Sequence, residues 1–351
     1  MINTDLTDRQ KLILALTIQE YTRTAQPVAS NRLLDRYGLD LSSATVRNEM
    51  AALADIGYLR QPHTSAGRIP TEEGFRFFVG QLMGQTELPA TTRQTIAHQF
   101  YQTRQDSDEW MRLAASVLAK QSHAASLVTA PQHIHAKFKH LELISIHGRQ
   151  ILLVLVMQSG EVRQQMLSLM EHVPQETLSA TAYQITDLCA DKDLPGISGL
   201  PPQSDALTDD ILKLVRDLMD QGDDQISGEV YRDGLLNVLT EPEFAESDSA
   251  RRALRVLEER PFLENLLTRT VLNSDIGVVQ VIIGGEGNWE ELSECSVVLA
   301  RYGIHGTATG TLGVLGPIRM RYGRTISTVR FVAGLLSEMV LETHRSGGEE
   351  N

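Results

Sequence analysis

Apolar residues in the first 60 positions recur at spacings of three and four, which is typical of consecutive helices that each bury one face. The first predicted helix spans 6–23, with Leu12, Ile13, Leu16 and Tyr21 on its apolar face. Pro27 prevents it from continuing, and a second, short helix is predicted over 30–37 before Gly38. A third helix follows, capped by Ser42 or Ser43 and ended by Gly57.

After Gly57 the periodicity changes to that of a short two-stranded turn. Residues 58–60 and 68–70 predict two strands, joined by a turn that contains Pro62, Ser65 and Gly67. The chain returns to helix near Thr71, with apolar positions that continue to Leu82. Three helices, a two-stranded wing and a fourth helix are the layout of a winged helix-turn-helix.

The third predicted helix has two chemically different faces. Val46, Met50 and Leu53 share the inward face, so Arg47 and Asn48 must lie among small residues on the outward face. Arginine can bind guanine, and asparagine adenine, each through two hydrogen bonds in the major groove. We therefore expect Arg47 and Asn48 to contact bases.

The start of this helix and the wing carry groups suited to the DNA backbone. Hydroxyl groups and free amides near a helix N-terminus bind phosphate oxygens, and cationic side chains follow the flanking backbone. The expected contacts are Ser42, Ser43 and Thr45 at the helix start, and Arg60, His63 and Arg68 in the wing. A winged helix can instead be a protein-docking module, and an Arg-Asn pair can be merely solvated, so these residues alone leave both interpretations open.

A family resemblance bears on that choice. Residues 41–79, LSSATVRNEMAALADIGYLRQPHTSAGRIPTEEGFRFFV, are similar almost position by position to the signature block of the heat-inducible transcription repressor HrcA family. The similarity returns near the end of the chain in VVQVIIGGEG, CSVVLARYG and GTLGVLGPIRMRY. Two departures are visible: Ala29 replaces an expected glycine, and Arg321 stands where the family tends to carry an acidic residue.

Beyond residue 105 the pattern predicts an α+β region with an interruption. A helix at 106–121 precedes strands at 126–129, 141–147, 151–158 and 162–169, three of them joined as antiparallel hairpins. Five helices are then predicted, at 176–190, 208–220, 228–240, 249–258 and 261–269. Strands resume at 276–283, 296–302 and 311–315, before a final helix at 327–342. A sheet that is interrupted by helices and then completed indicates an inserted subdomain.

These patterns give the expected domains, which the resemblance names. We expect a winged-helix DNA-binding domain at 1–85, a linker at 86–104, an inserted helical subdomain at 201–272 and a polar tail at 346–351. The sheet domain is expected in two parts, at 105–200 and 273–345. The resemblance implies that this domain is a GAF-like antiparallel sheet domain and that the insert is a dimerising domain.

Composition and charge narrow the function. The 351 residues carry a net charge of -13, but residues 1–85 hold nine basic and nine acidic side chains, so the excess lies entirely beyond them. Any nucleic-acid binding must therefore be local. Two cysteines, no signal-peptide pattern and no apolar run near ~20 residues predict a cytoplasmic protein without a membrane partner.

Three other motifs are candidate sites. An HxH pair, His133 and His135, has the alternation of a metal site, but no carboxylate or cysteine lies at ligand spacing, so no metal or other cofactor is expected. GGEGNW lacks the third glycine of a dinucleotide loop and predicts a tight strand exit. Arg319 in GPIRMRYGR is either part of an anion pocket or the partner of an acidic neighbour.

The resemblance implies a non-enzymatic repressor that binds double-stranded DNA as a homodimer. In the family, the operator is an inverted repeat upstream of chaperone operons, and a chaperonin keeps the repressor in its active fold until heat diverts it to other clients. Two rivals remain open. One is a regulator whose GAF-like domain senses a small molecule, and the other is a small-molecule enzyme with a winged-helix appendage that uses His133, His135 or Arg319.

Overall fold

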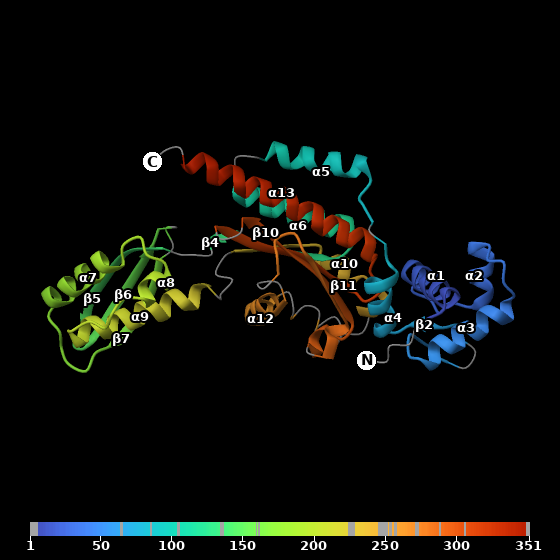
Figure 1. Cartoon of the computed structure of the whole chain (residues 1–351), viewed down its shortest axis with the longest axis horizontal. Helices are drawn as coiled ribbons and strands as arrows, with labels where there is room; N and C mark the ends of the chain where they lie inside the picture. The colour runs from blue at the N-terminus through green and yellow to red at the C-terminus, as the bar shows by residue number, and fades with distance from the viewer. Residues whose placement is uncertain are drawn as a thin grey trace. The chain divides into compact units, whose positions relative to one another are not determined.

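The computed structural model (Figure 1) describes residues 6–63, 66–84, 86–103, 106–133, 137–158, 160, 162–223, 229–244, 252, 255, 258–270, 274–287, 289–304 and 307–348. Its contacts divide the chain into two compact units. Unit 1 comprises Met1–Ala130, Glu229–Gly303 and Gly310–Asn351. Unit 2 comprises Pro131–Gly228 and Ile304–Thr309, so most of it is inserted between two parts of unit 1.

Unit 1 begins with a region of short helices, residues 6–84, which we call the head. Its elements are α1 (Asp8–Thr24), α2 (Ser30–Tyr37), α3 (Ser43–Asp55), β1 (Leu59–Arg60), β2 (Ile69–Pro70), α4 (Glu72–Phe77) and a π-helical turn η1 (Phe78–Leu82). Thr7 forms a capping box with Gln10 at the start of α1. Gly38 ends α2 at a φ of 60°, a left-handed conformation that glycine adopts without strain. The predicted helices and the two-stranded turn are confirmed, with ends that differ by at most two residues at the helices and one at the strands.

The rest of unit 1 is built on a sheet in the order β8-β3-β11-β10-β9, and β4, which belongs to unit 2, pairs with Ala308 and Thr309 at the start of β11. Its strands are β3 (Ala125–Thr129), β4 (Gln132–His133), β8 (Val230–Asp233), β9 (Val279–Ile283), β10 (Cys295–Ile304) and β11 (Ala308–Pro317). Strand pairs β3/β8, β3/β11 and β9/β10 are antiparallel. All ten residues of β11 are buried, so helices or loops must cover both faces of the sheet at this strand.

Helices flank this sheet. They are α5 (Ala90–Gln102), α6 (Ser107–Ser122), α10 (Leu235–Leu239), α12 (Arg260–Thr270) and α13 (Tyr322–Gly348), with 3-10 turns η2 (Pro242–Phe244), η3 (Gly284–Gly287) and η4 (Glu290–Leu292). α6 and α13 pack on each other, and α6 packs on β3 and β8 (Figure 1). The fully buried side chains of Val329, Val332 and Leu336 lie at spacings of three and four, which gives α13 its buried face.

Unit 2 contains a separate three-stranded antiparallel sheet in the order β5-β6-β7. Its elements are β5 (Phe138–His147), β6 (Gln150–Met157), β7 (Val162–Ser168), α7 (Gln175–Cys189), α8 (Leu194–Ser198) and α9 (Ala206–Asp223). Alternate residues of β6, from Ile151 to Met157, are buried in one core with Leu178 and Ile185 of α7 and Leu212 of α9. The helices therefore cover one face of this sheet.

The other face of the β5-β6-β7 sheet mixes apolar side chains with polar ones, among them Glu142 and Gln164 beside Val154, and is open within the described part of the chain. Ile144 of β5 is in register with Leu152 of β6, and Leu152 with Met166 of β7. The side chains of Ile144 and Met166 are 41% and 55% exposed, and Val162 is 51% exposed. We call this surface the open face, defined by Ile144, Leu152, Val154, Val156, Val162 and Met166. Exposed apolar side chains gathered in this way are typical of surfaces that associate with another molecule.

The sheet assignment corrects one expectation. The strands at 141–169 were expected to belong to the same sheet as the strands after residue 276, with the insert at 201–272. They instead pair among themselves and share a core with α7–α9. Hairpin pairing is local and was predicted from the sequence, whereas membership of a larger sheet depends on long-range partners that no local pattern specifies.

Three other expectations also change. The expected linker at 86–104 contains α5, which buries Ile96 and Phe100 at a helical spacing of four. The helix expected at 228–240 is a strand, β8, followed by α10, because Gly234 takes a left-handed φ of 72° between them. The final helix α13 starts at Tyr322 and runs to Gly348, into the expected tail. No helix among the described residues is long and apolar enough to cross a membrane.

Candidate nucleic-acid interface

Helix α3 separates its buried and exposed residues as its periodicity predicts. Val46, Met50 and Leu53 are at most 1% exposed, whereas Arg47 and Asn48 are exposed. The Ser42 hydroxyl caps the helix by accepting a hydrogen bond from the Thr45 amide at 3.0 Å. Packing and capping thus fix the helix and leave Arg47 and Asn48 directed to solvent.

Two polar contacts hold α3 against the other helices of the head. Arg9 of α1 forms an ion pair of 2.6 Å with Glu49 of α3. The hydroxyls of Ser30, at the start of α2, and Ser43 lie 3.1 Å apart and share a hydrogen bond. Ser42 is likewise hydrogen-bonded to the Thr45 hydroxyl, at 2.8 Å. The three hydroxyl groups predicted to contact phosphate are therefore already oriented by neighbours.

A buried carboxylate joins α1 to α2. The side chain of Glu20 is completely buried, and it forms ion pairs with Arg23 at 2.8 Å, Arg32 at 2.7 Å and Arg36 at 3.2 Å. Hydrogen bonds from Arg23 lower the pKa of Glu20 below its ordinary value of 4.5, against the opposing effect of burial. Sequence reasoning missed this cluster, although Arg23 stands three residues after Glu20 in the same helix.

The wing is anchored beside α3. Backbone hydrogen bonds of 2.9 Å in both directions join Arg68 to Val28. A Cβ at Gly67 would lie 2.4 Å from the Val28 carbonyl carbon and oxygen, so only glycine permits this close approach. The Arg68 guanidinium donates a hydrogen bond of 3.5 Å to the main-chain carbonyl of Arg47. One arginine of the wing is thus placed directly against the predicted recognition helix.

A polar cleft of about 600 Å³ lies between the start of α2, α3 and the wing. We call it the recognition cleft. Its polar and charged lining residues are Ser30, Asn31, Ser43, Arg47, Gln61 and Arg68. Arg47 and Arg68 supply the only formal charges among the described lining residues, and an acid-free cleft of this kind attracts phosphate.

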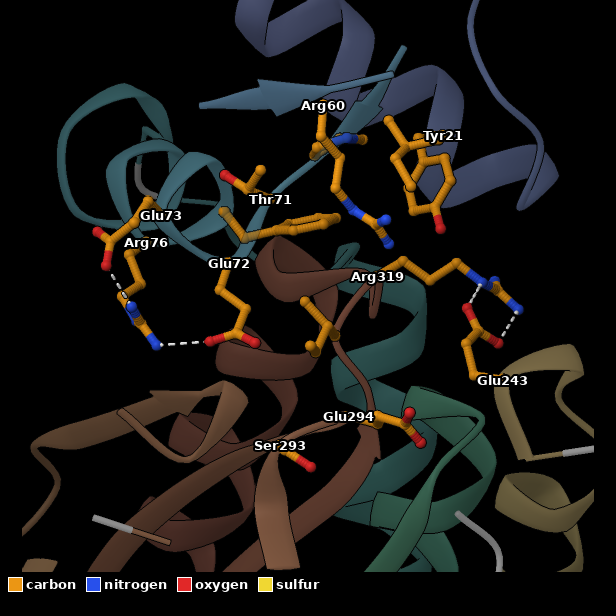
Figure 2. A pocket seen from close by; sticks show the side chains of 14 residues that line it. Tyr21, Arg60, Thr71, Glu72, Glu73, Arg76, Glu243, Ser293, Glu294 and Arg319 are labelled. Atoms are coloured by element: carbon orange, nitrogen blue, oxygen red, sulfur yellow. Dashed lines mark hydrogen bonds and ion pairs between the residues drawn. The ribbon is translucent and has the colours of Figure 1, made fainter. Parts of the chain in front are cut away.

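The structure separates one predicted contact from the others. Arg60 pairs across the wing with Ile69, and neighbouring positions on a strand point to opposite faces. Arg68, next to Ile69, therefore lines the recognition cleft, whereas Arg60 faces a second cleft with Tyr21 (Figure 2). His63 is exposed at the wing turn. Ser42, Ser43, Thr45, Arg47, Asn48 and Arg68 remain on or beside α3.

The second cleft, about 540 Å³ in volume, lies where the head meets the rest of unit 1, and we call it the junction cleft (Figure 2). At one side, Arg76 of α4 binds Glu72 at 3.0 Å and Glu73 at 2.5 Å, and donates to the carbonyl of Ile283 at 2.7 Å. A Cβ at Gly284 would lie 2.3 Å from the Glu72 carboxylate. The GGEG motif is thus the predicted tight strand exit, and it also receives α4.

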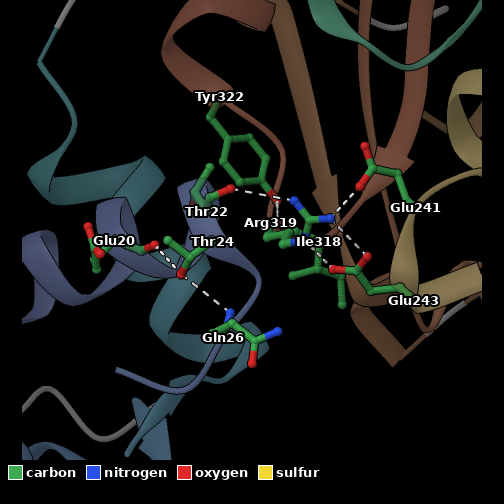
Figure 3. A network of polar contacts seen from close by, with 9 residues as sticks. All are labelled: Glu20, Thr22, Thr24, Gln26, Glu241, Glu243, Ile318, Arg319 and Tyr322. Carbon is green, nitrogen blue, oxygen red and sulfur yellow. Dashed lines mark hydrogen bonds and ion pairs between the residues drawn. The ribbon is translucent and has the colours of Figure 1, made fainter. Parts of the chain in front are cut away.

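At the other side of the junction cleft, Arg319 resolves the two alternatives left for it (Figure 3). Its guanidinium is paired with Glu241 and with Glu243, and it donates to the carbonyl of Thr22 in α1 at 3.4 Å. Arg319 is therefore the partner of acidic neighbours, and it also ties the end of α1 to the sheet.

The histidine pair offers no described metal site. His135 lies outside the described residues, and among those that are described no group of three histidine, cysteine or acidic side chains could hold a metal ion. Both cysteines, Cys189 and Cys295, are free and buried. Burial raises the pKa of the Cys189 thiol to about 11, so this thiol is protonated and inert near neutral pH.

Comparisons with known proteins cover nearly the whole chain. A family model described as "HrcA protein C terminal domain" matches residues 108–326. The heat-inducible transcription repressors HrcA of Roseiflexus castenholzii and Chloroflexus aggregans are 45% and 44% identical. The first alignment covers 99% of this chain and 98% of the relative, and the second covers 97% and 94%.

A solved structure shares the fold. A crystal structure described as that of a hypothetical protein is 24% identical, with a TM-score of 0.58, and the match covers 96% of this chain and 98% of that one. This similarity supports the arrangement of the elements without bearing on activity. The family match and the full-length relatives together show that the chain belongs to the HrcA family of heat-inducible transcription repressors.

Proposed function

We propose that residues 1–85 form a winged-helix DNA-binding domain whose α3 enters the major groove of an inverted-repeat operator. The observation that carries this proposal is the exposed pair Arg47 and Asn48, next to a recognition cleft whose charges come from arginine alone. Membership of a family of transcription repressors supports DNA as the partner. We infer that the rest of unit 1 corresponds to the GAF-like domain that the family resemblance implies.

The roles of the residues follow from their positions. Arg47 and Asn48 bind base edges, while Ser42, Ser43 and Thr45 offer hydroxyl groups and the α3 N-terminal amides to one phosphate. Arg68 and His63 bind flanking phosphates. Arg60 is left out of this set, because its side chain faces the junction cleft.

An inverted repeat needs two heads, and we propose that the open face of unit 2 joins two copies of the chain. The in-register row Ile144, Leu152 and Met166 gives each copy a flat apolar strip across three strands. Two such strips related by a two-fold axis are self-complementary. In this proposal the dimer contact lies in the inserted unit at 131–228, whereas the family resemblance implied a dimerising domain that was expected at 201–272.

Heat inactivation needs no ligand in this scheme. A winged helix that binds alone binds weakly, so operator affinity depends on the dimer, and dimer formation depends on correctly folded unit 2. Loss of either releases the DNA. We propose that a chaperonin restores the folded dimer, as the family resemblance implies, and that chaperonin diverted by heat leaves the operons expressed.

The test is a binding-site selection with the full chain and a random duplex library, with and without chaperonin, followed by titration of the selected duplex. An enriched inverted repeat, bound more tightly by protein incubated with chaperonin, is the expected result. A duplex that carries only one half of the selected repeat should bind much more weakly than the full repeat. If no sequence is enriched, either with or without chaperonin, the repressor mechanism is refuted.

A further inference from the structure

The junction cleft holds a cation that nothing in the proposed function uses. The Arg60 side chain is exposed, and Figure 2 shows it extending toward Tyr21 and Arg319. Each acidic side chain that lines the cleft has an arginine partner: Glu72 and Glu73 bind Arg76, Glu243 binds Arg319, and Glu294 binds Arg252. Arg60 has no acidic partner among the described residues.

The wall around Arg60 combines an apolar surface with hydrogen-bond donors. Ile69, Pro70, Phe75 and Ile318 line the cleft, together with the hydroxyl-bearing side chains of Tyr21 and Ser293. Burial, and then the negative charge of Glu243, raise the pKa of Tyr21 above its ordinary value of 10. Tyr21 therefore stays protonated near neutral pH, and its hydroxyl can donate a hydrogen bond to an anion.

The geometry points to the junction cleft as a binding site for a small organic monocarboxylate, held by Arg60 and Tyr21 with its carbon body against Phe75 and Ile318. A guanidinium offers two parallel donors that match a carboxylate. The volume of about 540 Å³ is within the range of small-molecule sites. This site is independent of the proposed DNA contacts.

The charges of the cleft select the class of anion. Its lining includes three arginines, Arg60, Arg76 and Arg319, and four glutamates, Glu72, Glu73, Glu243 and Glu294. With Arg252, which binds Glu294, the arginines and glutamates at the cleft balance. A single carboxylate therefore matches the one guanidinium that has no acidic partner among the described residues, whereas a dianion such as phosphate would bring a second, unbalanced negative charge. The apolar wall favours a ligand with a carbon body over acetate.

The position of the site gives it a consequence for the repressor. Arg60 and Tyr21 belong to the head, whereas Ser293 and Ile318 belong to the sheet region of the same unit. A ligand that contacts both sides stabilises the position of the head against the sheet region. If the carboxylate binds this position and another position of the head with different affinities, carboxylate binding is coupled to DNA binding.

The test is calorimetric titration of the full chain, free of DNA, with benzoate as the probe. The wild type should bind benzoate saturably at one site per chain, and Arg60→Gln should weaken binding at least about tenfold because it removes a charge-assisted pair. Arg232→Gln, which removes the same charge from an exposed position of β8 outside both clefts, should bind as the wild type does. Benzamide, acetate and inorganic phosphate should each bind at least about tenfold more weakly than benzoate.

Several results would overturn this site. They are no saturable benzoate binding, equal binding by Arg60→Gln and the wild type, an equal loss in Arg232→Gln, and equal binding of benzamide or phosphate. Equal unfolding midpoints of the variants show that folding is not the cause of a loss. Because no DNA is present, failure here leaves the operator proposal standing, and failure of the site selection leaves this one standing.

Discussion

The exposed face of α3 and the open face of the β5-β6-β7 sheet are both the uncovered sides of elements that bury their other side. On α3, the exposed side carries Arg47 and Asn48 beside a cleft that contains no acidic lining residue. On the sheet, the exposed side carries Ile144, Val162 and Met166. The centres of the buried sides are alike, since Val46 and Leu53 of α3 and Leu153 and Leu155 of β6 are all fully buried aliphatic side chains.

The difference shows where partner choice is encoded. Burial of aliphatic residues fixes each element in place and says little about function. Packing does not restrict the residue types on the exposed side, so their chemistry indicates the partner. Hydrogen-bond donors among small residues fit base edges and phosphates. A flat aliphatic strip fits another apolar surface. On this basis we propose that one chain carries a surface for DNA and a surface for a second copy.

The largest expected effect is on the sheet. Met166→Asp should convert the dimer to monomer and lower operator affinity at least about hundredfold, because a carboxylate buried without a partner costs several kcal/mol, and ~1.4 kcal/mol is tenfold. Light scattering and operator titration measure the two effects. Tyr183→Asp is the control: it places the same charge on an exposed position of α7, the helix that packs on the other side of the sheet. A dimeric Met166→Asp protein would refute the proposed interface.

On α3, Asn48→Ala should weaken binding to the selected duplex by about 1–3 kcal/mol per half-site, because two hydrogen bonds to one base are lost. Gln19→Ala removes an exposed amide from α1 and should leave binding unchanged. Fluorescence anisotropy measures both. If the two variants bind alike, Asn48 makes no base contact.

The next effect concerns the support of α3. Glu20→Gln should lower the free energy of unfolding by about 1–3 kcal/mol, since a buried acceptor of charged donors is weakened. Its three arginines are 42–47% exposed and can be hydrated, so the loss should stay below that of a fully enclosed pair. Urea denaturation followed by circular dichroism measures it.

The same residue predicts a pH dependence. Because the folded pKa of Glu20 is lowered, its stabilisation is complete above the ordinary value of 4.5 and disappears as pH falls through the folded value. The unfolding free energy of the wild type should therefore fall more steeply below pH 5 than that of Glu20→Gln. Parallel curves for the two proteins would show that the ion cluster contributes nothing to acid sensitivity.

The smallest expected effect is in the wing. Arg68→Gln should weaken all duplexes several-fold and reduce the slope of log affinity against log salt by about one, because one phosphate contact is lost. Relative affinity for mutated half-sites should not change. A sequence-dependent loss would instead make Arg68 a base contact.

The sequence predicted the head well because its signals are local. Pro27, Gly38 and the caps at Ser42 and Thr71 each act within a few residues, and the observed helix ends lie close to them. The face of the wing on which the Arg60 side chain lies could not be predicted from such local signals. It depends on the register between β1 and β2, in which Arg60 faces Ile69 and so leaves Arg68 on the opposite side.

Long-range pairing limited the prediction elsewhere. The hairpins of β5, β6 and β7 were predicted from strand-like runs on either side of Gly148 and Gly160, yet nothing in these runs shows that they form a sheet of their own. The Glu20 cluster has the same origin, because Arg32 and Arg36 reach Glu20 only once α2 packs on α1. Gly234 was a local signal that went unused: a glycine inside a predicted helix can mark its interruption.

The most direct test of the central claim repeats the duplex selection with Arg47→Ala and with Arg93→Ala, which removes the same charge from α5, outside the head. Arg47→Ala should retain the inverted repeat and its spacing, lose preference at one base pair in each half-site, and bind about 1–3 kcal/mol more weakly per half-site. Arg93→Ala should select the wild-type sequence with the wild-type affinity. An Arg47→Ala protein that selects that same sequence with unchanged affinity would contradict the assignment of α3 as the recognition helix.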